Sequence, residues 1–98
     1  MTNEINDLIV SAFDEYFKEL LNLKINIENE IKNEFPNLNF YLNLSVLELY
    51  IIILSNDFNV KQILKLVNIL EKFNYDYHYL ELENNTFILN FFEKINGD

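Results

Sequence analysis

The chain has 98 residues, of which 16 are aspartate or glutamate, seven are lysine and none is arginine, for a formal net charge of −9. Proteins bind nucleic acids mainly by neutralising phosphates with Lys and Arg, so this balance argues against DNA, RNA and anionic membranes as partners. The same negative field attracts basic proteins. A second interpretation stays open, in which the charge only keeps a small apolar protein in solution.

The composition is that of a folded domain in a reducing compartment. Half of the residues are hydrophobic and 15% are aromatic, which supplies a core for one domain over residues 1–98. Cysteine is absent, so neither a disulfide framework nor thiolate chemistry is expected, and the sequence predicts a cytoplasmic location. Residues 1–7 are polar and acidic, unlike the start of a signal peptide.

Residues 3–35 have the periodicity of a helix, with apolar side chains at spacings of three and four along one face. These residues are Ile5, Ile9, Phe13, Tyr16, Leu20, Leu23, Ile27 and Ile31. Pro36 ends the pattern, because proline disfavours a helical residue before it. At ~1.5 Å per residue the helix approaches ~45 Å, longer than a small domain's core. We therefore expect it to overhang, to break near Asn22, or to meet a second copy.

After Pro36 the apolar period changes to two. Residues 38–43 alternate as in a strand with one buried face, and the isoleucine-rich residues 46–54 predict a second, nearly fully buried strand. The join between them lacks glycine, and Ser45 with Glu48 also fits a helix capping box. A helix over residues 46–54 therefore remains an alternative.

A second amphipathic helix is predicted over residues 60–73. Asn59 and Gln62 fit a capping box at its start, and Asn74 stands where a left-handed residue would end it.

Two further strands are predicted near the end of the chain. Residues 75–83 alternate between apolar and polar side chains, Asn84-Asn85 fits a tight turn, and residues 86–95 follow as a strand. Residues 96–98 are expected to fray.

The predicted order is α-β-β-α-β-β, which is an α+β fold. The second and third strands flank a helix, so the right-handed crossover rule makes them parallel within one sheet. The most apolar strands, the second and fourth, suit central positions, which gives a spatial order of 3-4-2-1. This topology resembles a permuted ferredoxin-like sandwich, a four-stranded sheet with two helices on one face.

The residue inventory argues against an enzyme, a cofactor or a metal site. There is no cysteine, one glycine near the C-terminus and one histidine, so phosphate-binding loops and Cys/His metal sites cannot be built. His78 alternates with Leu80 and Leu82, which predicts a hydrogen-bonded structural histidine at the core or its margin. Carboxylate pairs such as Glu15 with Glu19 are interpreted as solvated faces.

Strand alternation predicts a second, uncovered face of the sheet that is rich in tyrosine. With only two helices, no element of the chain remains to cover this face, and an exposed surface of this composition is typical of a binding site. We expect it to contain Asn39, Tyr41, Asn43, Glu48, Tyr50, Ile52, Tyr75, Tyr77, Tyr79, Glu81, Ile88, Asn90 and Phe92. The other candidate surface is the acidic outer side of the first helix. Together the candidate partner-binding residues are Asp7, Asp14, Glu15, Glu19, Tyr41, Tyr50, Tyr75, Tyr77, Tyr79, Glu81 and Glu83.

The expected function is that of a small acidic inhibitor. It would block a larger basic protein that handles nucleic acid, by electrostatic steering and an aromatic contact. This profile is similar to that of phage-encoded anti-CRISPR and anti-restriction proteins and of toxin-neutralising immunity proteins, a likeness of type without a family motif. A phage-encoded chain would act in the host cytoplasm. The alternative is a homo-oligomeric structural or adaptor protein, such as a homodimer, that assembles through its sheet face and long helix.

Overall fold

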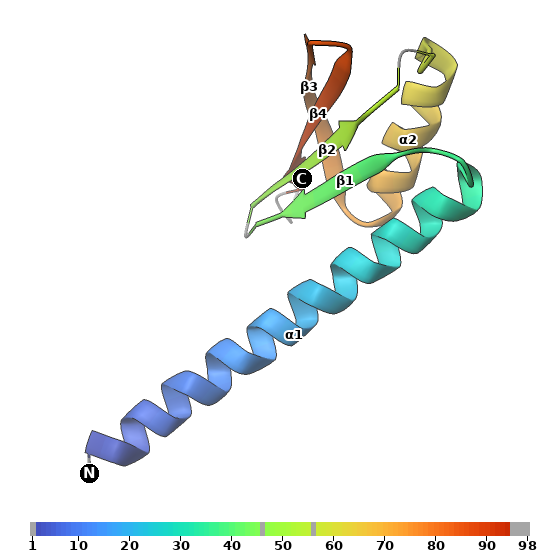
Figure 1. Cartoon of the computed structure of the whole chain (residues 1–98). Helices are drawn as coiled ribbons and strands as arrows, with labels where there is room; N and C mark the ends of the chain where they lie inside the picture. The colour runs from blue at the N-terminus through green and yellow to red at the C-terminus, as the bar shows by residue number, and fades with distance from the viewer. Residues whose placement is uncertain (1, 46, 56, 95–98) are drawn as a thin grey trace.

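Figure 1 shows the computed structural model of the chain, which describes residues 2–45, 47–55 and 57–94. The elements follow the predicted order of an α+β fold. They are α1 (Thr2–Glu34), β1 (Phe40–Leu44), β2 (Glu48–Ile53), α2 (Val60–Lys72), β3 (Tyr75–Glu83) and β4 (Thr86–Glu93). The expectations for Val46, for Ile95 and for residues 96–98 lie outside the described residues.

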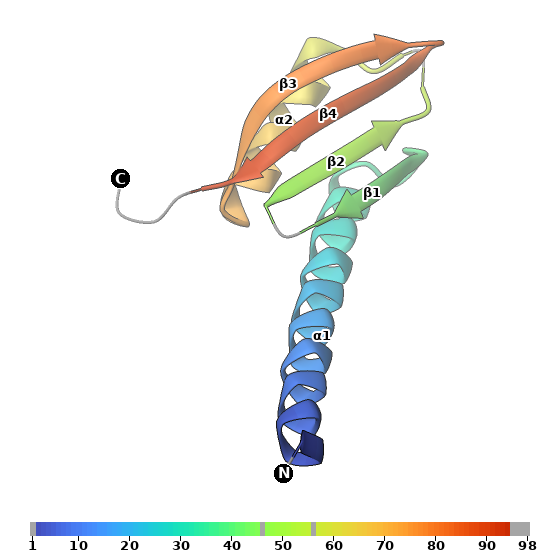
Figure 2. The same cartoon turned by 90° about the vertical axis from the view of Figure 1, so that its left-hand side faces the viewer.

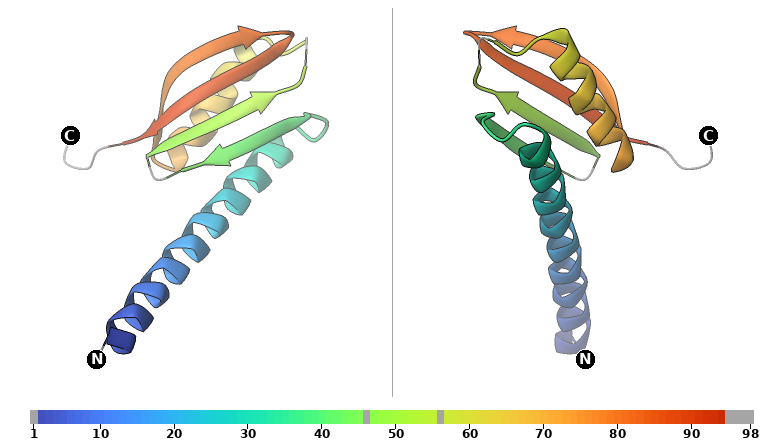
Figure 3. Two further views of the ribbon diagram at one scale, coloured as in Figure 1. Left: turned by 60° about the vertical axis from the view of Figure 1, so that its left-hand side comes forward. Right: turned by 90° about the vertical axis from the view of Figure 1, so that its right-hand side faces the viewer.

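The four strands form one sheet in the order β1-β2-β4-β3, which confirms the predicted order. Every neighbouring pair is antiparallel. Because β2 and β3 both pair antiparallel with β4, they run in the same direction, as the crossover rule requires (Figure 2). Both helices lie on one face of the sheet (Figure 3). The described residues therefore form two layers, and none of their helices or strands covers the second face of the sheet.

The ends of α2 follow from side chains that the sequence singled out. The Asn59 side-chain oxygen accepts from the Gln62 backbone N–H at 3.0 Å, and the Gln62 side-chain oxygen accepts from the Asn59 N–H at 2.8 Å. The capping box is therefore confirmed. Asn74 follows the helix with φ 71°, the predicted left-handed residue.

The two hairpin turns use local hydrogen bonds and asparagine. The Ser45 backbone N–H donates to the Glu48 carbonyl at 2.9 Å, which closes the turn between β1 and β2. Ser45 therefore belongs to a hairpin and caps no helix. Asn84 and Asn85 have φ 49° and 63°, so both adopt the left-handed conformation of a tight turn between β3 and β4.

The core lies between the helices and the covered face of the sheet. Its buried side chains are Ile27, Ile31, Leu42, Leu49, Ile51, Ile53, Phe58, Leu66, Ile69, Leu70, Tyr75, Leu89 and Phe91. In β2 the buried residues alternate with half-buried ones. The expectation of a nearly fully buried second strand was wrong, because the helices cover only one face of the sheet.

Helix α1 is continuous past Asn22 and overhangs the body of the protein (Figure 1). Near its C-terminal end, Ile27 and Ile31 are fully buried in the core. We call residues 2–22 the arm: its N-terminal part projects beyond the sheet, and its last turns line pockets together with Leu44 and Tyr75 of the body. The radius of gyration is 16.4 Å, whereas a compact chain of this length has about 13 Å. Of the three expected outcomes for this helix, the overhang is the one observed.

Candidate protein-binding surfaces

The first candidate surface is the face of the sheet that the helices leave uncovered, which we call the open face (Figures 2 and 3). Strand register places its side chains in three rows across the sheet, since directly paired residues share a face. The rows are Tyr41, Ile52, Ile88 and Glu81, then Asn43, Tyr50, Asn90 and Tyr79, then Glu48, Phe92 and Asp76. Aromatic rings, aliphatic side chains and carboxylates thus alternate over one surface.

Tyr50 stands at the centre of the open face and is fixed by hydrogen bonds. Its hydroxyl donates to Glu48 Oε2 at 2.7 Å, and it also interacts with the Tyr79 hydroxyl. The hydrogen bond to the Glu48 carboxylate, followed by burial, raises the pKa of Tyr50 well above its ordinary value. Tyr50 therefore stays neutral at physiological pH and presents a ring in a defined orientation.

A β-bulge in β3 changes which tyrosines reach the open face. The pairing with β4 shifts between Tyr77 and Tyr79, so that Tyr77 pairs with Phe91 and Tyr79 with Asn90. Strict alternation along the strand, which the sequence-based prediction assumed, is therefore broken at His78. Residues of β3 before the bulge therefore lie on the opposite face of the sheet from the one predicted.

Tyr75 and Tyr77 consequently lie on the helix-facing side, which corrects the predicted membership of the open face. Tyr75 is 3% exposed and belongs to the core. The Tyr77 ring contacts the buried Phe91 ring edge-on at a centroid distance of 5.9 Å. Of the five tyrosines among the candidate binding residues, Tyr41, Tyr50 and Tyr79 therefore remain on the open face.

His78 occupies the bulge and lies exposed on the open face, so the prediction that it faces the core or its margin was wrong. The predicted structural hydrogen bond is present, since His78 Nδ1 and Asn90 Oδ1 are 3.1 Å apart. The imidazole also packs edge-on against Phe92 at 4.5 Å and Tyr79 at 5.1 Å. Beneath it, Asn90 is fully buried, and its Nδ2 has no hydrogen-bond partner in the described structure.

Carboxylates surround these rings. Glu81 and Glu83 are exposed and lie on the open face, since they pair with Ile88 and Thr86. Asp76 lies on the same face and approaches Lys94 at 3.7 Å. The tyrosines of the open face thus sit within a negative field.

The predicted acidic residues of the first helix are all exposed, but they form a separate surface. Asp7, Asp14, Glu15 and Glu19 project from the arm. Both helices cover the other side of the sheet (Figure 3), so these carboxylates and the open-face tyrosines do not make one flat patch. The structure brings Tyr41, Tyr50, Tyr79, Glu81 and Glu83 together and keeps the arm carboxylates apart.

Sequence reasoning named the long helix as an oligomerisation surface, but it placed none of the apolar side chains of the arm among the candidate binding residues. Ile5, Leu8 and Ile9 are 60%, 71% and 48% exposed, and the pattern that buries Ile27 and Ile31 further along α1 continues through them. The signal was the helix length, which exceeds the core that one chain can build. The arm is therefore a second candidate surface.

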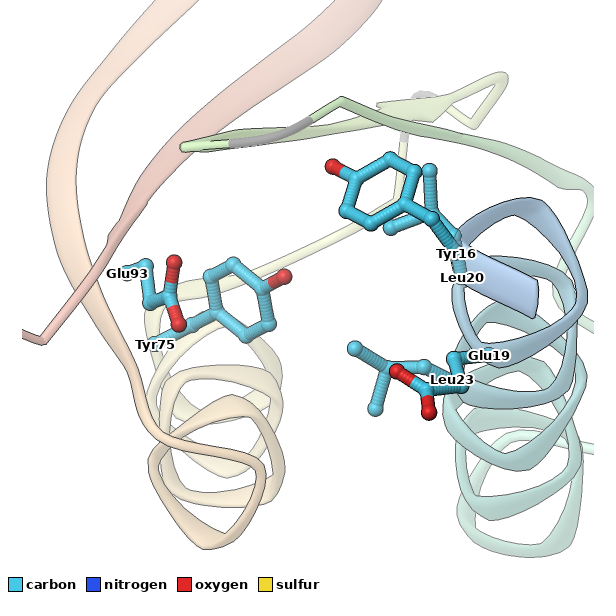
Figure 4. A pocket seen from close by; sticks show the side chains of 6 residues that line it. All are labelled: Tyr16, Glu19, Leu20, Leu23, Tyr75 and Glu93. Carbon is cyan, nitrogen blue, oxygen red and sulfur yellow. The ribbon is translucent and has the colours of Figure 1, made fainter. Parts of the chain in front are cut away.

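A groove lies where the arm leaves the body (Figure 4). Tyr16, Glu19, Leu20 and Leu23 line it from α1, and Tyr75 and Glu93 line it from the opposite side. Burial raises the pKa of Tyr75, and the nearby Glu93 carboxylate adds to the effect. The groove is therefore apolar at its base and acidic at its rim.

Two further observations concern membranes and metals. Neither helix, over the residues described, combines the length and apolarity that crossing a bilayer needs. Among the same residues, no three or more His, Cys, Asp or Glu side chains gather in an arrangement suited to a metal ion. Comparisons with protein-family models, curated proteins and solved structures give no match for this chain.

Proposed function

We propose that the chain is a small acidic protein-binding inhibitor that covers a basic surface of a larger, nucleic-acid-handling protein. The observation that carries the proposal is the open face, an uncovered sheet surface with Tyr41, Tyr50 and Tyr79 set among carboxylates. Tyrosine supplies a large contact area at low entropic cost, because it has only two side-chain torsions. An exposed surface of this composition is typical of a protein-binding site.

Electrostatic attraction favours a basic partner for the proposed contact. The net charge of −9 draws a basic partner into encounter, and Glu81 and Glu83 lie beside the rings that would make the contact. A basic surface that normally holds phosphates would be closed to nucleic acid while the inhibitor is bound. The chain contributes occlusion and no catalytic step.

The class of inhibitor is part of the same proposal. Anti-CRISPR, anti-restriction and toxin-neutralising proteins are often short, acidic and cysteine-poor, and this chain would act like them in the cytoplasm, in a host cell if the gene belongs to a phage. The alternative function, a homo-oligomeric structural protein, draws its support from the arm. A dimer formed through the arm leaves the open face free, so the two functions are compatible.

The test is affinity capture of partners from the native host lysate, with a variant and a matched control. Tyr79→Ser removes a ring from the open face, whereas Leu82→Ser removes an exposed apolar side chain from the other side of the same strand. We expect the wild type and Leu82→Ser to retain a basic nucleic-acid-binding protein and Tyr79→Ser to lose it.

The captured partner is then measured by calorimetry at ~50 mM and ~200 mM salt, with and without nucleic acid. We expect affinity to fall with salt and nucleic acid to compete. Equal capture by both variants, or affinity that neither salt nor nucleic acid alters, would contradict the proposal.

A further inference from the structure

The arm carries one continuous apolar stripe that changes from exposed to buried along its length. Ile5, Leu8, Ala12, Tyr16, Leu20 and Leu23 follow each other at spacings of three and four and therefore share a face of α1. Leu8 is 71% exposed, Tyr16 is 38% exposed, and Ile27 at the next turns is fully buried. The stripe that builds the core thus continues for about 30 Å beyond it, at ~1.5 Å per residue.

The exposed apolar area of this stripe is about what one partner contributes to a small specific interface. At the observed exposed fractions, the stripe offers on the order of 500 Å² of apolar surface per chain, the size of the largest apolar patch on a typical monomer, which is often a binding site. Two such stripes would bury ~1,000 Å², which reaches the threshold for a specific interface. The stripe ends in the groove at the base of the arm, where Leu20 and Leu23 line one side.

The carboxylates of the arm are unevenly placed around α1. With 3.6 residues per turn, Asp7 and Asp14 project from the side of α1 opposite the stripe. Glu15 and Glu19 lie at the edge of the stripe, and Glu19 lines the groove beside Leu20 and Leu23. Between these carboxylates the stripe is apolar over the length of the arm, and the arm of a second copy of this chain has an apolar surface of the same length.

We propose that two copies of the chain pair through their arms, antiparallel, with the two-fold axis close to Ala12. Leu8 of one copy then lies level with Tyr16 of the second copy, and Ile5 lies level with Leu20. The tip of each arm reaches the groove of the other copy, so both apolar surfaces are covered at once. Ala12 is exposed and small, which permits close approach of the two helices where they cross.

The antiparallel direction follows from two features. Opposed helix dipoles attract, whereas parallel ones repel. Parallel pairing would also leave each groove empty, because both arm tips would point away from the bodies.

This dimer does not depend on the proposed function, because the open face is on the other side of the sheet. It would give the protein two open faces per particle. Two linked contacts raise the apparent affinity for a partner with two sites, if the spacing allows both to engage.

The first experiment measures mass in solution by size exclusion with light scattering. We expect the wild type to have twice the chain mass of 11.8 kDa. Leu8→Glu places a charge on the stripe and should give the monomer mass, whereas Ser11→Glu, on the charged side of the arm, should remain dimeric. Both positions are exposed and outside the core, so thermal unfolding of the body should be preserved in both variants under conditions where both are monomeric.

The second experiment uses the absence of cysteine in the chain. Near the two-fold axis, Ala12→Cys brings two Cα atoms within the ~4.4–6.8 Å that a disulfide spans, whereas Ser11→Cys points away. We expect mild oxidation to cross-link Ala12→Cys into a covalent dimer and to leave Ser11→Cys monomeric on a non-reducing gel. A monomeric wild type, a dimer that survives Leu8→Glu, or equal cross-linking at both positions would each overturn the proposal.

Discussion

The buried amide of Asn90 provides a quantitative test of the open face. Asn90 is fully buried in β4, its Oδ1 lies 3.1 Å from His78 Nδ1, and its Nδ2 has no hydrogen-bond partner in the described structure. An unsatisfied buried donor costs ~1–3 kcal/mol of stability. Replacing the amide with a branched apolar side chain of similar size removes this cost. His78 is exposed, so its Nδ1 can bond to water once the amide is gone.

We therefore expect Asn90→Val to raise the free energy of unfolding by ~1–2 kcal/mol, after the lost hydrogen bond is subtracted. Valine also favours strands by up to ~1 kcal/mol, an effect that has to be separated. Asn43→Val is the matched control, because Asn43 lies in the same row of the open face but is exposed. The difference between the two variants isolates the buried amide.

Urea unfolding at constant m-value measures both variants. In thermal unfolding, a difference of ~1 kcal/mol corresponds to ~4–8 °C for a domain of this size. If Asn90→Val is less stable than Asn43→Val, the amide contributes to folding and the reasoning is refuted. If it is more stable, Asn90 is kept at the centre of the open face at a cost in stability, as is typical of binding sites.

Three further predictions concern the core, the tyrosine network and a helix cap. Ile27→Ala should lower the free energy of unfolding by ~2–5 kcal/mol in urea, because Ile27 is fully buried, whereas Ile25→Ala, at a 44% exposed neighbour, should cost far less. The raised pKa of Tyr50 means that the folded state holds its proton more tightly than the unfolded state. This contribution to stability is complete below pH ~10, the ordinary pKa of tyrosine, and is lost as the pH rises above that value. Between pH ~9 and pH ~11, urea unfolding should therefore show a larger fall in the free energy of unfolding for the wild type than for Glu48→Gln. Asn59→Ala should cost ~1 kcal/mol in the same assay, because it removes the side-chain acceptor of the α2 capping box, and an unchanged midpoint would contradict that role.

Much of the fold could be predicted because its signals are local. The asparagines at positions 59, 74, 84 and 85 mark a cap, a helix end and a tight turn, and all of these are present. The β-branched residues Ile51–Ile53 correctly favoured a strand over a helix. The strand order followed from the crossover rule and from which strands were apolar.

The candidate site was predicted only in part, because a bulge leaves little trace in the sequence. No glycine accompanies the extra residue at His78, and the residues around it continue to alternate as in a regular strand. Tyr75 and Tyr77 were therefore placed on the wrong face, while Tyr79 and Glu81 beyond the bulge were placed correctly. The long helix was recognised from its periodicity, but its overhang depends on how far the sheet reaches, which no local pattern reports.

The bulge also hinders other chains from pairing with the β3 edge of the sheet. Strand β3 is an edge strand, and a flat edge with free backbone N–H and C=O groups invites other chains to extend the sheet. The bulge interrupts the regular spacing of these groups, and Asp76, Glu81 and Glu83 place negative charges along the same strand. The opposite edge, β1, is only five residues long. We expect such edges to resist fibril growth, so a protein with half of its residues hydrophobic can be concentrated without polymerising through its strands.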